Sequence, residues 1–115
     1  MQDMYTVAIN GVALHVDAEN AAFMQRYATA AAAIPNQPTK DNAEGIRQYC
    51  KAFRVFFDTL FGDGTAAAVF ADVPDNRREY EKTFMQLLKA MFEQRIAAKL
   101  RLVEAVKRYA PGEMV

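Results

Sequence analysis

The residue types that most often carry out chemistry are scarce in this chain. His15 is the only histidine and Cys50 the only cysteine among 115 residues, so a Ser-His-Asp or Cys-His triad has a single candidate base. His15 falls on the polar side of a predicted β-hairpin, where we expect an ordinary surface residue. Cys50 falls beside Tyr49 and Phe53 on an apolar helix face, where a thiol behaves as a small hydrophobe with a raised pKa. Neither residue indicates nucleophilic catalysis.

Two further patterns look like ligand sites at first sight. Residues 62–65, Gly-Asp-Gly-Thr, have the small side chains of a phosphate loop but lack the lysine and the preceding strand of a P-loop. The end of one helix and the start of the next explain them. Asp72, Asp75, Glu79 and Glu81 match no calcium-loop or helical metal spacing, so we interpret them as capping and solvated charge. We therefore expect no enzymatic activity, no cofactor and no metal site.

The composition predicts one globular domain over residues 1–115. Hydrophobic residues make up 52% of the chain and charged residues 24%, values close to the globular average. Fourteen Lys and Arg residues balance fourteen Asp and Glu residues, so no overall field attracts nucleic acid or an anionic membrane. Residues 1–10 lack the features of a signal peptide, and no apolar run reaches about 18 residues. We expect a soluble intracellular protein that binds neither nucleic acid nor a membrane.

Residues 4–16 predict a β-hairpin. Two runs rich in β-branched and aromatic residues flank Asn10-Gly11, the pair that best tolerates the positive φ angles of a type I′ turn. A two-residue loop places three apolar pairs on one face: Ile9 with Val12, Val7 with Leu14, and Tyr5 with Val16. This face should pack on helices. The free strand edges, with Tyr5 and Val7, are candidate partner-binding sites.

The rest of the chain predicts helices, and therefore a mainly α domain. Asp17 is the expected N-cap of a helix over residues 18–34, which Pro35 ends. Asp41 begins a capping-box pattern that opens a second helix over residues 41–61, with aromatic residues at three- and four-residue spacings. Together with the hairpin, these helices should form a bundle.

Two more helices complete the predicted bundle. Gly62 ends the second helix, and Thr65 is the expected cap of a short helix over residues 65–71. The segment 72–75 contains a proline and acids, which suit the first turn of a helix. We therefore expect a long last helix over residues 73–109.

This last helix changes character along its length. Its first half carries a broad apolar stripe that predicts core packing: Tyr80, Phe84, Leu87, Leu88, Met91 and Phe92. Its second half carries a thinner stripe with Arg95 and Lys99 beside it: Ile96, Leu100, Val103 and Val106. A narrow apolar stripe flanked by charge is typical of a helix that meets another helix outside its own core. We expect residues 93–110 to project and to bind a partner through these side chains.

The middle of the chain carries a resemblance. From Tyr49 to Phe70, an aromatic helix ends in Phe57-Asp58 and Phe61-Gly62, followed by Gly64-Thr65 and a short Ala-rich helix. This stretch of about 22 residues resembles the tail assembly chaperone-like proteins encoded in the tail-morphogenesis regions of siphophages and prophages. The resemblance implies a non-enzymatic role in the cytoplasm of a bacterial host. Such a protein keeps the tape measure protein in solution and brings tail tube subunits to it.

Two other functions stay open at the level of sequence. The stripe from Ile96 to Val106 could instead build a homo-oligomer of a structural or adaptor protein of a phage or prophage. An enzyme or small-ligand binder would use an aromatic pocket near Tyr49 and Phe53. Binding pockets depend on a few convergent polar groups, and none is evident there.

Overall fold

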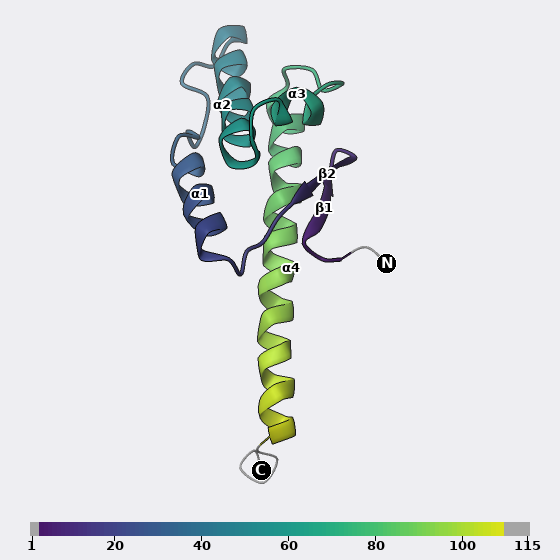
Figure 1. The fold of residues 1–115 in the computed structure, drawn as a ribbon. Coiled ribbons are helices and arrows are strands. Elements are labelled where there is room, and N and C mark those ends of the chain that lie inside the picture. The colour runs from purple at the N-terminus through teal and green to yellow at the C-terminus, as the bar shows by residue number, and fades with distance from the viewer. Residues whose placement is uncertain (1–2, 110–115) are drawn as a thin grey trace.

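A computed structural model describes residues 3–109 and shows a mainly helical fold (Figure 1). In this part of the chain an N-terminal antiparallel hairpin packs against four helices, as the sequence predicts. The elements are β1 (Thr6–Ile9), β2 (Val12–His15), α1 (Ala21–Ala31), α2 (Ala43–Phe61), α3 (Thr65–Val69) and α4 (Arg77–Tyr109). The molecule is elongated, 62 × 29 × 23 Å, because the last part of α4 runs past every other element (Figure 1). None of the described helices is long and apolar enough to cross a membrane.

The hairpin has the predicted turn and register. Asn10 and Gly11 have φ angles of 50° and 81°, and positive values at both positions are what a type I′ turn requires. The strand pairs are Thr6 with His15, Val7 with Leu14, Ala8 with Ala13, and Ile9 with Val12. Ile9 is fully buried, whereas His15 is exposed on the opposite face. The prediction of one apolar and one polar face is confirmed.

The helix predicted over residues 18–34 is shorter at both ends. Its N-cap is Asn20, whose side-chain oxygen accepts a hydrogen bond of 2.9 Å from the amide of Phe23. The predicted cap Asp17 instead accepts from the backbone of a turn that precedes the helix. After Ala32 the amides of Ala33 and Ile34 donate to the carbonyls three residues before them, which is the spacing of a 3₁₀ turn.

The second helix ends where predicted but begins two residues late. Asn42, and not Asp41, is the cap: its side chain accepts from the amide of Gly45 at 2.9 Å. Gly45 also lies against the preceding loop, where an added Cβ would stand 2.0 Å from the carbonyl oxygen of Lys40. Gly62 ends α2 with φ 113° and ψ 156°, a conformation that is essentially restricted to glycine.

The short third helix is capped from another element. Thr65 is its first residue and not its cap, and Gly64 in the left-handed region precedes it without a capping side chain. The amide of Ala66 donates to the Asp58 carboxylate of α2 at 2.8 Å. The helix then ends at Val69, two residues before the predicted end.

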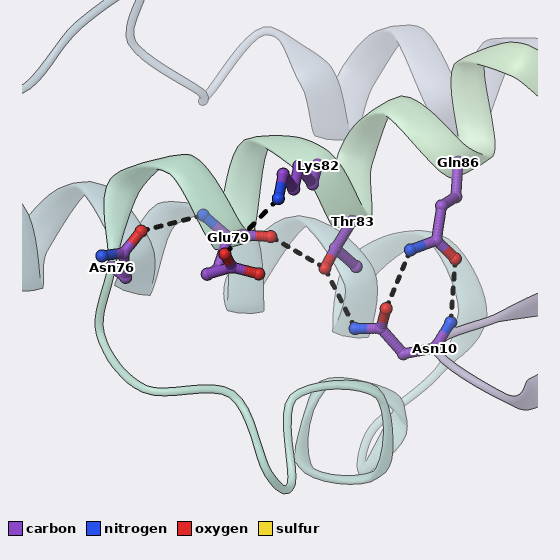
Figure 2. Close-up of polar contacts among 6 residues, drawn as sticks. All are labelled: Asn10, Asn76, Glu79, Lys82, Thr83 and Gln86. Carbon is purple, nitrogen blue, oxygen red and sulfur yellow. Dashed lines mark hydrogen bonds and ion pairs between the residues drawn. The ribbon is translucent and has the colours of Figure 1, made fainter.

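The start of the last helix was predicted four residues too early. Asn76 caps α4 by accepting from the amide of Glu79 at 3.0 Å (Figure 2). Residues 72–75 are therefore a connection and not a first helical turn. Asp75 in this connection accepts a hydrogen bond from Arg54 of α2 at 3.0 Å, so its carboxylate serves a contact between elements.

The core is largely aromatic, and α2 supplies more of it than any other element. Phe53, Phe56 and Phe57 are at most 2% exposed, and Cys50 is fully buried among them. Phe70 and Tyr80 stack with their ring centroids 4.1 Å apart. The predicted core role of Cys50 is confirmed, and burial raises the pKa of its thiol.

Asn10 holds the turn of the hairpin against α3 and α4, and Figure 2 shows its contacts with α4. Its side-chain amide donates to the hydroxyl of Thr83 and to the carbonyl of Val69, each at 3.0 Å. Gln86 completes the contact: it donates to the Asn10 side chain at 2.8 Å and accepts from the Asn10 backbone amide at 2.9 Å. All polar groups of the Asn10 side chain are therefore used to dock the turn.

The base of the hairpin is fastened by Gln94, which is only 1% exposed. Its amide nitrogen donates to the carbonyls of Met4 and Val16 at 2.9 and 2.7 Å. Its oxygen accepts from the amide of Ala18 at 2.7 Å. One side chain of α4 therefore satisfies three backbone groups where the chain enters and leaves the hairpin.

Replacing Gln94 by methionine tests this contact, because methionine keeps the volume and removes the hydrogen bonds. Three backbone groups would lose their partner, so we expect the free energy of unfolding to fall by about 2–4 kcal/mol. Urea denaturation measures it. The same change at the exposed Gln48 should stay within about 0.5 kcal/mol. Equal effects at the two positions would contradict the role of Gln94.

Candidate protein-binding surface

The exposed apolar side chains are concentrated on α4. Of the ten large hydrophobic residues exposed in the described part of the chain, eight lie on this helix. They are Met85, Phe92, Ile96, Leu100, Leu102, Val103, Val106 and Tyr109. Scattered apolar residues on a surface are ordinary, whereas a contiguous group marks a site of interaction. The helix therefore presents the clearest candidate surface of the described chain.

The side chains predicted from the second half of the helix lie together on this surface. Ile96, Leu100, Val103 and Val106 are between 39% and 60% exposed. Arg95 and Lys99 are exposed beside them. Residue 110, the predicted end of the projecting segment, lies outside the described residues.

The expected core stripe of the first half was wrong for Phe92, which is 62% exposed. Leu87, Met91 and Gln94 turn toward the core, at spacings of four and three residues. Phe92 follows Met91 directly, so it points roughly 100° away around the helix. Met85 is also exposed, seven residues before Phe92. The seven-residue repeat was the signal in the sequence that could have found both side chains.

The two hairpin residues among the predicted sites have structural contacts. Val7 packs against the core. The hydroxyl of Tyr5 donates to Glu19 at 2.6 Å, and Glu19 is also paired with Arg101 of α4. The bonds from Tyr5 and from Arg101 lower the pKa of the Glu19 carboxyl. Tyr5 is therefore linked to the α4 surface through one carboxylate, whereas Val7 is not part of that surface.

A cleft of about 490 Å³ lies between the end of α1, α2 and α4. Its lining is mostly apolar: Ala31, Ile34, Pro35, Asn36, Tyr49, Phe53, Glu81, Phe84, Met85 and Leu88. Tyr49 and Phe53 line it, so it is the pocket that the enzyme or small-ligand alternative would use. Met85 belongs both to the cleft and to the exposed side of α4, so the two surfaces are continuous.

The carboxylate in the cleft is already occupied. Glu81 accepts from the hydroxyl of Tyr49 at 2.6 Å and from Arg77 at 2.9 Å. Burial alone would raise the pKa of Glu81, but these two bonds outweigh it and the pKa is lowered. Burial and then the bond to Glu81 raise the pKa of Tyr49 to about 12. Within residues 3–109, no cluster of three or more His, Cys, Asp or Glu side chains could hold a metal ion.

The segment that carries the resemblance forms the corner between α2 and α3. Phe57 is fully buried and contacts the rings of Phe61 and Phe70. Asp58 caps α3, and Gly62 supplies the backbone angles of the corner. Each of these residues has a role in folding. Folding therefore accounts for the motif, and none of these residues by itself indicates a binding site.

The model of a family of unknown function, DUF6673, matches residues 10–114. This match spans the hairpin turn and all four described helices, including the α4 surface. Neither a curated protein nor a solved structure matches the chain.

The Tyr49–Glu81 contact predicts a titration at high pH. Because the folded-state pKa of Tyr49 lies above the ordinary value of 10, its stabilising effect should be present below pH 10 and be lost as the pH rises to about 12. The ultraviolet absorbance of phenolate, compared between the wild type and Tyr49→Phe, isolates this group. Glu81→Gln should lower the pKa of Tyr49 but leave it above 10, because the burial remains. An ordinary pKa in the wild type would contradict the contact.

Proposed function

Because the chain belongs to DUF6673, whose function is unknown, we propose its role from the α4 surface and from the resemblance of residues 49–70. The protein is a non-enzymatic tail assembly chaperone-like protein of a phage or prophage. It binds the tape measure protein, the tail tube protein, or both, in the cytoplasm of the bacterial host.

The observation that carries this proposal is the exposed apolar side of α4. A chaperone that keeps an aggregation-prone partner in solution has to offer apolar area before the partner arrives. Phe92 and Leu100 are 62% and 60% exposed on this side, although large apolar residues are among those most often buried. Burying these side chains against a partner would therefore stabilise the complex, because folding leaves their apolar area in water.

The position of the surface also supports a binding role. Within residues 3–109, the side-chain hydrogen bonds that join the second half of α4 to the rest of the protein come from Gln94 and Arg101. The helix continues to Tyr109 and runs past every other element (Figure 1). A partner can therefore approach it from several sides without displacing the hairpin or α1.

Co-expression with the tape measure protein encoded in the same genome tests the proposal. We expect more tape measure protein in the soluble fraction and co-purification of the two proteins. The double variant Leu100→Asp and Val103→Asp should abolish both effects, since it places two carboxylates on the apolar side.

Val55→Asp is the control, because Val55 is 49% exposed and belongs to α2 and not to the α4 surface. This variant should behave like the wild type. Circular dichroism of all variants checks that the helices are intact. If the wild-type protein changes neither the solubility nor the purification of the tape measure and tail tube proteins, the proposed function is wrong.

A further inference from the structure

The exposed side of α4 follows a heptad repeat that is longer than the stripe seen in its second half. Seven exposed positions are separated alternately by four and three residues: Met85, Lys89, Phe92, Ile96, Lys99, Val103 and Val106. This spacing is the a and d pattern of a coiled coil, in which one side of a helix faces a second helix continuously. Residues 85–106 extend over about 33 Å at 1.5 Å per residue. We call these seven residues the seam.

Two of the seven seam positions are lysines, Lys89 and Lys99. No hydrogen bond or ion pair joins Lys89 or Lys99 to another of the residues 3–109. Phe92 and Ile96 lie between them on the seam. A helix that covered these apolar side chains would bring its own flanking residues next to both ammonium groups. Carboxylates at those positions would compensate the loss of water around the lysines.

The charges around the seam favour the same partner. Residues 85–109 contain six basic residues, Lys89, Arg95, Lys99, Arg101, Lys107 and Arg108, and two acidic residues, Glu93 and Glu104. Six minus two leaves a net charge of +4. Of the six cations, Arg101 is paired with Glu19 of the same chain. The remaining excess of positive charge attracts a partner of negative charge.

We propose that the seam of α4 binds one acidic amphipathic helix of a partner protein, about three heptads long, with glutamate or aspartate beside its apolar stripe. The inference rests on the proposed function only in that α4 binds a protein, and it adds the secondary structure and the charge of the partner. It also extends the binding site to Met85, at the mouth of the cleft between α1, α2 and α4.

A second copy of the chain fits this surface less well. A parallel pair in register would place Lys89 on Lys89 and Lys99 on Lys99. An antiparallel pair that aligns Lys89 with Val106 places Lys99 opposite Ile96, so neither lysine meets a carboxylate. Both arrangements bring together two helices of net charge +4, and like charges across a coiled coil oppose pairing.

A lipid surface also fits less well. A helix that lies in an anionic membrane carries its cations along the edges of the apolar face. Here Lys99 stands within the seam, between Ile96 and Val103, and Lys89 stands between Met85 and Phe92. Insertion of this face would carry both ammonium groups toward the acyl chains, whereas a protein helix can offer each of them a carboxylate.

Binding of two designed peptides to the full chain tests the inference. Each peptide has four heptads, with leucine at the a and d positions. All remaining positions are glutamate in the acidic peptide and lysine in the basic peptide. Fluorescence anisotropy should give a dissociation constant at least about tenfold lower for the acidic peptide, and salt at about 0.5 M should weaken its binding. The double variant Lys89→Glu and Lys99→Glu should reduce that preference at least about tenfold. Val55→Asp should leave it unchanged.

Several results would overturn the inference. Equal binding of the two peptides would mean that charge does not select the partner, and no binding of either would remove the helical site. A dimer in light scattering that becomes a monomer on Val103→Asp would assign the seam to a second copy. Binding to phosphatidylglycerol vesicles without binding of the acidic peptide would assign it to a lipid surface.

The experiments distinguish a failure of this inference from a failure of the proposed phage tail function. If the acidic peptide binds but the tape measure and tail tube proteins do not, the inference stands and the proposed function fails. If the tape measure protein binds equally well to the wild type and to the Lys89→Glu, Lys99→Glu variant, the proposed function stands and the inference fails.

Discussion

The structure depends on hydrogen bonds from α4 to the backbone of the hairpin. A two-stranded hairpin is marginal in water, so this one needs a surface that holds it in place. Gln94 satisfies three backbone groups at its base, and Gln86 and Thr83 hold the Asn10 turn at its other end. The two attachments fix the hairpin along α4 in one register. Ile9 then points into the core, where α2 and α3 complete the enclosure.

This attachment divides α4 into sides with different tasks. The side that carries Leu87, Met91 and Gln94 is buried against the core and the hairpin. The seam lies on another side, so binding a partner there does not compete with folding. Substituting the exposed apolar residues would therefore cost the fold little. Stability alone therefore does not explain a Phe92 that is 62% exposed.

The sequence predicted what local chemistry controls. The hairpin register followed from Asn10-Gly11 and an alternation of two, and the end of α2 followed from Gly62. Three helix starts were missed because an asparagine stands close after each favoured acid: Asn20, Asn42 and Asn76 are the caps. Both residue types cap helices well, so tertiary packing decides between them. The same reason applies to Phe92 and Gln94, since periodicity shows which residues share a side but not which side is buried.

The charges of the chain balance overall but are unevenly distributed along it. The fourteen basic and fourteen acidic residues cancel, and a zero sum argues against any strong field. Residues 77–109, which form α4, hold nine of the basic residues and four of the acidic ones, a net of +5 that leaves −5 for the rest of the chain. Fields at a surface act over about 10 Å in ordinary salt, which is short beside a molecule 62 Å long. An approaching partner therefore meets the local charge of α4 and not the neutral total. An acidic helix is attracted to the positive charge of α4. The negative charge on the rest of the chain disfavours its binding elsewhere on the protein.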